Sequence, residues 1–259
     1  MNSRAIRFYE DRLSAAIHYP EIKSEKYPAV LFVHGFVGNK VGAHRIFVKA
    51  AQAIAKAGYI SFRFDFSGCG ESDGDYSDVT VSKQMKELKA AIKYVSGLDH
   101  VDSENIILVG HSLGGAVTAL TAYQIPQIKK VVLWSPVARP YVDITTITGE
   151  EAVKTAETQG TFDYMGFLLS NEFFNDLKQH QPLESITSFK GSVFIIHGDA
   201  DQDVPKENAE MYAQPISSNQ RVKYSFIEGA DHTFTNTAWE KELFKKTIQW
   251  LTDIKDPRS

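Results

Sequence analysis

Short apolar runs alternate with longer amphipathic segments along most of this chain. Eight short, β-prone runs predict strands at 6–9, 13–19, 29–33, 60–64, 106–109, 131–134, 193–196 and 222–227, the first two as an antiparallel pair. Several of these runs are almost continuously apolar, which is typical of strands covered by helices on both faces. Helical patterns fall at 46–57, 81–95, 115–123 and 240–254. This alternation predicts an α/β fold with a mostly parallel, eight-stranded sheet flanked by helices.

The stretch from 137 to about 190 interrupts this alternation. It contains no convincing strand, and helical patterns occur only near 149–157 and 162–178. Because a structureless connection of that length is uncommon, we expect a helical insertion that forms a lid over the sheet, within one domain covering 1–259. Aromatic side chains of the insertion could contact a substrate or only pack it against the body. The candidates for substrate contact are Phe162, Tyr164 and Phe167.

Composition narrows the class of protein. With 259 residues, 43% of them hydrophobic, the chain can bury a large core, and its net charge of −4 gives no sign of a nucleic-acid surface. No apolar run reaches the roughly 20 residues of a membrane helix, and the first residues lack the apolar region of a signal peptide. Cys69 is the single cysteine, so no internal disulfide can form. We therefore expect a cytoplasmic monomer or homodimer without a membrane span.

A glycine-flanked serine provides the first sign of chemistry. Gly110-His111-Ser112-Leu113-Gly114 lies between a predicted strand and a predicted helix. In that context the pattern indicates a nucleophile elbow, in which a tight turn projects the serine hydroxyl away from the sheet. The helix N-terminus adds partial positive charge where an oxyanion would develop. The alternative is an ordinary glycine- and serine-containing loop.

A serine hydroxyl needs a positioned base, and His232 is the best candidate among eight histidines. It lies in the turn Gly229-Ala230-Asp231-His232, directly after the last predicted strand. The elbow arrangement has the chain order serine, acid, histidine, and only His232 follows every candidate acid. We therefore expect it to deprotonate Ser112.

The acid should follow the strand at 193–196, where three aspartates occur. Asp201 is our choice, and Asp199 and Asp203 remain alternatives because alternate residues of a tight loop face different ways. The same aspartates, with Glu210, match the ligand positions of a calcium loop. Val204 occupies the position where such a loop needs glycine, so we expect no metal.

Two backbone amides are candidates for an oxyanion hole. The N–H of Leu113 follows the nucleophile directly, and the loop His34-Gly35-Phe36 after an early strand offers the N–H of Phe36. The glycine-rich stretch 66–74 lacks the lysine of a phosphate-binding loop, so we expect no nucleotide and no other cofactor.

Together these motifs resemble those of the α/β-hydrolase superfamily, and within it the small bacterial carboxylesterases that include cinnamoyl (feruloyl) esterases. The matching motifs are His34-Gly35-Phe36, 65–72, 110–114, Asp199-Ala200-Asp201 with Val204-Pro205, and 229–232. The resemblance implies an α/β-hydrolase fold with Ser112 as nucleophile, Asp201 as acid and His232 as base. It also implies an oxyanion hole formed by Phe36 and Leu113.

The predicted activity is hydrolysis of small to medium carboxylic esters, including aryl or hydroxycinnamoyl esters, through an acyl-enzyme. A thioesterase, a monoacylglycerol lipase or a small-peptide hydrolase would use the same triad, and these alternatives stay open. A non-catalytic ligand-binding homologue is less favoured, because it would be free to lose any of the three roles. The expected partner is a small-molecule ester.

Overall fold

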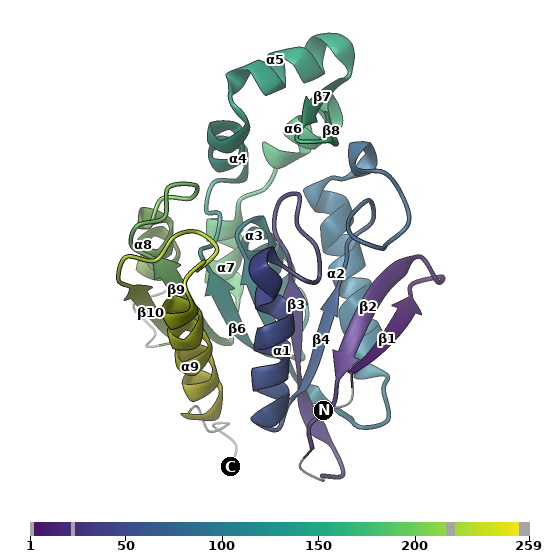
Figure 1. Ribbon diagram of the computed structural model, residues 1–259, viewed down its shortest axis with the longest axis vertical. Coiled ribbons are helices and arrows are strands. Elements are labelled where there is room, and N and C mark those ends of the chain that lie inside the picture. The colour runs from purple at the N-terminus through teal and green to yellow at the C-terminus, as the bar shows by residue number, and fades with distance from the viewer. Residues whose placement is uncertain (1–2, 22–23, 216–220, 254–259) are drawn as a thin grey trace.

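The structure is a computed structural model that describes residues 3–21, 24–215 and 221–253 (Figure 1). Its strands are β1 (Ser3–Phe8), β2 (Leu13–His18), β3 (Tyr27–Val33), β4 (Ile60–Phe64), β5 (Val101–His111), β6 (Ile128–Trp134), β7 (Thr161–Tyr164), β8 (Phe167–Ser170), β9 (Ser192–Gly198) and β10 (Val222–Ile227). Its helices are α1 (Ile46–Lys56), α2 (Val81–Ser96), α3 (Leu113–Ala122), α4 (Pro140–Thr148), α5 (Glu150–Gln159), α6 (Asn171–Leu177), α7 (Pro182–Ser188), α8 (Glu207–Ala213) and α9 (Thr237–Asp253). Two short 3-10 helices also occur among the described residues, η1 (Ala43–Arg45) and η2 (Tyr76–Asp78).

One sheet of eight strands forms the centre of the molecule, as the sequence predicts. Its strand order is β1-β2-β4-β3-β5-β6-β9-β10. The β1–β2 and β2–β4 pairs are antiparallel, and every pair from β4 across to β10 is parallel. Six carboxyl ends therefore meet at one edge, which is where open parallel sheets bind ligands.

Successive side chains of the central strands enter two separate cores. In β3, Val30 and Phe32 pack with α1 and α9, whereas Leu31 and Val33 pack with α2 and α3 on the other face. Figure 1 shows α1 and α9 together in front of the sheet. Period-two alternation between two apolar faces explains why these strands are apolar throughout. None of the described helices is long and apolar enough to cross a bilayer.

Helices α4, α5 and α6 and the β7–β8 hairpin, here called the lid, stand above the carboxyl edge of the sheet (Figure 1). The hairpin corrects the sequence-based expectation of a strand-free segment with a helix over 162–178. Met165 and Gly166 take positive φ angles of 55° and 88° and turn the chain, so helix begins only after Ser170, whose side chain accepts the Phe173 N–H. Helix α7 packs against α3 instead and belongs to the body. The expected helix end at residue 254 lies outside the described residues.

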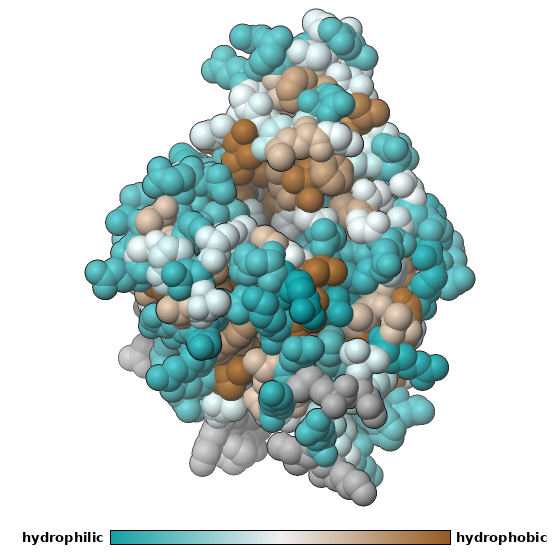
Figure 2. Space-filling model, viewed as in Figure 1, coloured by the Kyte–Doolittle hydropathy of each residue, from teal (hydrophilic) through white to brown (hydrophobic). Residues whose placement is uncertain are grey.

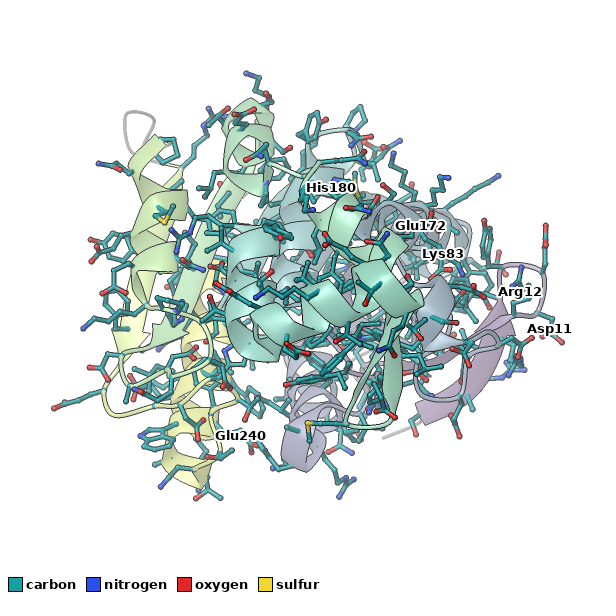
Figure 3. All side chains as sticks on the ribbon, turned by 90° about the horizontal axis from the view of Figure 1, so that it is seen from above. Asp11, Arg12, Lys83, Glu172, His180 and Glu240 are labelled. Carbon is teal, nitrogen blue, oxygen red and sulfur yellow. The ribbon has the colours of Figure 1, made fainter. Side chains whose placement is uncertain are left out.

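Aromatic and polar contacts join the lid to the body. The ring of Phe173 stacks on that of Phe36, with centroids 5.8 Å apart. At the amino end of α2, the carboxylate of Asp176 accepts the N–H and hydroxyl of Ser82, and His180 Nε2 lies 3.1 Å from Asp176 Oδ2. Figure 2 shows apolar residues gathered where lid and body meet, and Figure 3 shows His180 on the side of the lid above α2.

A buried ion pair organises the loops beneath the lid. The Asp65 carboxylate is fully buried and accepts hydrogen bonds from Lys40 N (2.5 Å), Lys40 Nζ (2.6 Å) and Glu71 N (2.9 Å). Gly70 lies directly over this carboxylate with a φ of +53°, and a Cβ at that position would fall on its oxygens. The glycine is therefore needed for both its backbone conformation and its missing side chain.

We expect Gly70→Ala to lower stability by about 2 kcal/mol more than Gly58→Ala, or roughly 4–8 °C in Tm. Gly58 is the matched control because it also has a positive φ, +96°, but a Cβ there would meet nothing within 4 Å. Thermal unfolding followed by circular dichroism checks the prediction. An equal loss of stability in the two variants would mean that contact between the new Cβ and Asp65 does not contribute to the loss.

Candidate active site

Ser112 lies on a strained turn between β5 and α3. Its φ and ψ angles are 56° and −126°, a combination that non-glycine residues rarely adopt. Its amide donates to Trp134 O at 2.9 Å, and its carbonyl accepts from Gly115 N and Val137 N. These bonds hold the turn between two strands and a helix. The structure thus has the strand–turn–helix geometry that the sequence predicts around this serine.

Close backbone approaches around Ser112 explain the surrounding glycines. A Cβ on Gly35 would lie 2.8 Å from Ser112 Cβ, and one on Gly114 would fall on the carbonyl oxygens of Val33 and His34. The loop after β3 therefore lies directly against the serine turn. Side chains at either glycine would push the two segments apart.

The structure pairs His232 with Asp201, which favours this acid over the two alternatives. His232 Nδ1 lies 2.7 Å from Asp201 Oδ2, while Asp201 Oδ1 accepts the amides of Asp203 and Val204. Asp199 instead accepts the amide of Gly229. A carboxylate at Nδ1 fixes the tautomer in which Nε2 is free to accept a proton, as a general base requires.

A second histidine, His197, also binds this carboxylate. It is the penultimate residue of β9 and is fully buried, and its Nε2 lies 3.1 Å from Asp201 Oδ2 and 3.0 Å from Val204 O. Burial raises the pKa of Asp201, but hydrogen bonds from His197 and His232 outweigh burial and hold the pKa well below its usual value. Sequence reasoning assigned His197 no role. The available signal was its position at a strand end, four residues before the chosen acid.

His111 supports the other side of His232. Its Nε2 lies 2.9 Å from the His232 carbonyl oxygen, and the two rings are 4.9 Å apart at an angle of 39°. Burial, together with the nearby charge of His232, lowers the pKa of His111 to about 3. The ring is therefore neutral near pH 7, with its Nε2–H available to donate to that carbonyl.

The two amides predicted to form an oxyanion hole lie on segments next to Ser112. Leu113 is the first residue of α3, and Phe36 follows the glycine that touches Ser112. The loop bearing Phe36 is fixed by the buried ring of His34, whose Nε2 accepts the Phe66 amide at 3.1 Å. Burial lowers the pKa of His34, so this acceptor stays unprotonated.

A cavity of about 360 Å³ opens beside the serine. Its walls come from the loop after β3, the start of α1, the serine turn and the His232 segment: His34, Gly35, Phe36, Val37, Gly38, Asn39, Gly42, Ala43, Ile46, Phe47, His111, Ser112, His232 and Thr233. Ser112 and His232 therefore share one cavity. The volume lies at the lower end of the roughly 300–1,000 Å³ typical of small-molecule sites.

The three lid aromatics singled out in the sequence do not line this cavity. The ring of Tyr164 lies 5.4 Å from that of Phe36, and Phe167 packs on Tyr76 at 5.1 Å. Phe162 is partly buried against the core that contains α2 and α3. Tyr164 thus packs on Phe36, a residue of the cavity wall, without lining the cavity itself. Direct contact of the three aromatic side chains with substrate stays a prediction.

One group of residues could hold a metal within the described part of the chain. Ligand atoms of Asp201, Asp203 and His232 lie within 4.8 Å of one another. Both Asp201 oxygens already accept hydrogen bonds, and His232 Nδ1 faces one of them. The grouping is therefore explained by the acid–histidine pair and its supporting turn.

Comparisons with known proteins identify the fold. A family model described as alpha/beta hydrolase fold matches residues 28–158, just over half of the 259 residues. The chain is 27% identical over 245 residues to palmitoyl-protein thioesterase ABHD10, mitochondrial, of Bos taurus, covering 91% of this chain and 76% of that protein. Est1E from Butyrivibrio proteoclasticus with bound ferulic acid has a TM-score of 0.82 and 24% identity, covering 93% and 94% of the two chains. Mouse alpha/beta hydrolase domain-containing protein 10 has a TM-score of 0.77 and 22% identity, covering 98% and 100%.

The family match and the observed architecture support each other. The matched residues run from β3 into α5 and include the serine turn, and the sheet has the eight mostly parallel strands that the sequence predicts. The chain belongs to the alpha/beta hydrolase fold family.

Proposed function

We propose that this chain is a serine hydrolase that cleaves carboxylic esters or thioesters through an acyl-enzyme on Ser112. The observation that carries the proposal is the 2.7 Å pairing of His232 with buried Asp201, on the same cavity as Ser112. An acid, a base and a nucleophile from three distant segments converge there. That convergence is the arrangement that activates a serine hydroxyl.

Each group has a defined role in the proposed reaction. His232 Nε2 removes the proton of Ser112 Oγ as the oxygen attacks the substrate carbonyl. The amides of Phe36 and Leu113 donate to the developing oxyanion. His232 then protonates the leaving alcohol or thiol, and a water molecule, deprotonated by the same histidine, releases the acid. Asp201 stabilises the imidazolium that forms in both halves of the reaction.

The cavity favours small to medium acyl or aryl groups. Its apolar walls come from Phe36, Val37, Ile46 and Phe47, and about 360 Å³ suits a compact group. The relative named as a palmitoyl-protein thioesterase supports thioesters as a second substrate class, and the neighbour solved with ferulic acid supports aryl acids. The same acyl-enzyme chemistry serves esters and thioesters, because the attacked carbonyl is common to both.

We expect Ser112→Ala to lower kcat for p-nitrophenyl acetate by at least about 10³-fold, and His232→Ala to do the same, because these groups act as a unit. Initial rates at 405 nm and thermal unfolding measure activity and folding together. Ser135→Ala is the matched control, because Ser135 is also a buried serine with positive φ at a strand end but does not line the cavity. Retained activity in Ser112→Ala would contradict the assignment.

Acyl-chain preference tests the cavity. Ala43 is exposed at its rim, so Ala43→Leu adds bulk without disturbing the core. We expect kcat/KM to fall about 10-fold for octanoyl relative to acetyl esters and thioesters, because one or two methylene contacts correspond to factors of this size. An unchanged profile across acyl lengths would mean that acyl groups bind elsewhere.

The expected pH dependence of the reaction rests on two neighbours of His232 that keep one charge state near neutral pH. The pKa of Asp201 is held well below its usual value and that of His111 lies at about 3, so both keep their charge states between about pH 5 and pH 8. His232 is then the group whose protonation blocks proton transfer from Ser112. We expect log kcat/KM to fall on the acid side with a slope of about one per pH unit. A slope near two, with the protein still folded, would contradict this.

A further inference from the structure

His44 lies in η1, just before α1, and its ring reaches the segment that carries His232. Its Nε2 lies 2.8 Å from the carbonyl oxygen of Thr233, and its Nδ1 lies 3.1 Å from Glu240 Oε2 in α9. Figure 3 shows Glu240 on α9, on the side of that helix nearest α1. The contact with Thr233 falls one residue from the proposed catalytic base.

The backbone at His44 is strained in a way that serves this contact. His44 and the next residue, Arg45, have φ angles of 40° and 67°, in the left-handed region that favours glycine. Such conformations persist where the surroundings hold them in place, and they cluster at functional sites. Two consecutive left-handed residues directly before a helix are therefore unusual. A backbone hydrogen bond from Arg45 N to Gly42 O (3.1 Å) and the two ring contacts of His44 hold them.

Glu240 forms the far support of the ring. Its side chain is only 9% exposed, and Oε2 accepts from Lys49 Nζ at 2.6 Å as well as facing His44. A carboxylate and a carbonyl can only accept, so the imidazole makes both hydrogen bonds when both its nitrogens carry protons. The Nδ1 side of the ring thus contacts the nearly buried Glu240 carboxylate, and the Nε2 side contacts the Thr233 carbonyl.

The ring of His44 spans the two walls of the cavity. Ala43 and Ile46, on either side of it in sequence, line one wall, and His232 and Thr233 line the other. A single side chain therefore ties the loop after β3 to the His232 segment. Movement of that segment would change the distance from His232 to the serine on the opposite side.

The turn around His232 is otherwise held from its other side. His111 Nε2 lies 2.9 Å from the His232 carbonyl oxygen, and Asp201 Oδ2 lies 2.7 Å from His232 Nδ1. Within the turn itself, Asp231 accepts the Thr235 amide at 2.9 Å. The turn itself contains a left-handed residue, Phe234, with a φ of 54°. A strained turn needs anchors on both sides to keep a ring in place to within a fraction of an ångström.

We propose that His44 is a positioning residue for His232, acting through its hydrogen bond to the Thr233 carbonyl. The inference rests on the proposed hydrolase function of this site. His44 touches neither the serine nor the acid. It fixes the backbone from which the base projects, and so the geometry of proton transfer.

Two substitutions separate the two ring contacts. His44→Gln keeps an N–H donor near the position of Nε2, whereas His44→Ala removes both contacts. Lys49→Ala is the matched control, because it removes a partner of Glu240 without touching the His232 segment. Steady-state kinetics on p-nitrophenyl acetate and amide hydrogen exchange of the 231–235 turn are measured on all three variants and on the unmodified chain.

We expect His44→Ala to lower kcat about 10-fold with KM changed less than about twofold, since a small misplacement can cost up to about 100-fold. His44→Gln should recover kcat to within about threefold, and Lys49→Ala should leave it within about twofold. Exchange of the Phe234 and Thr235 amides should rise about fivefold or more only in His44→Ala.

The exchange measurement separates this inference from the proposed function. If the unmodified chain hydrolyses no ester or thioester but exchange rises only in His44→Ala, the hydrolase proposal fails and the anchoring role stands. If exchange in His44→Ala equals that of the unmodified chain, the anchoring role is wrong whatever the activity. Loss of kcat in His44→Gln as large as in His44→Ala would equally overturn it.

Discussion

The close backbone approach at Ser112 is the constraint on which the rest of the structure depends. A non-glycine residue at a φ of 56° and ψ of −126° costs on the order of 1–3 kcal/mol, and it persists because both β5–β6 pairing and α3 fix the chain on either side. The same approach forbids side chains at Gly35 and Gly114. The loop after β3 must therefore run directly beside the serine. That loop then forms one wall of the cavity.

The groups that surround His232 keep fixed charge states. The Asp201 carboxylate is buried but receives four hydrogen bonds, from two histidine rings and two backbone amides, which stabilise its charged form. Burial keeps His34 and His111 neutral, so they act as fixed hydrogen-bonding groups. In the proposed mechanism, His232 is then the ring that takes the proton of Ser112. An acid held ionised then stabilises the imidazolium without accepting its proton.

Local patterns predicted the sheet, because its strands are apolar on both faces and end at glycines or turns. They also predicted the Asp201–His232 pair, because chain order limits which histidine can follow the acid. Contacts between distant segments could not be predicted in this way: His44 has no chemical neighbour in sequence, yet it contacts Thr233 and Glu240, which lie 189 and 196 residues further along the chain. The β7–β8 hairpin was missed because strands of four residues are too short to show a period of two.

The lid and the cavity are related through Phe36. The Tyr164 and Phe173 rings pack on the Phe36 side chain, while the backbone of Phe36 is the proposed second oxyanion donor and its ring lines the cavity. A change in lid packing would therefore act on the site through this residue before it acted on a substrate directly. Phe36 belongs to the loop after β3, which lies against the serine turn, lines the cavity and is held in place by the buried Lys40–Asp65 pair. In the proposed reaction, discrimination among acyl groups depends on that loop, and lid packing acts on it through the Phe36 ring.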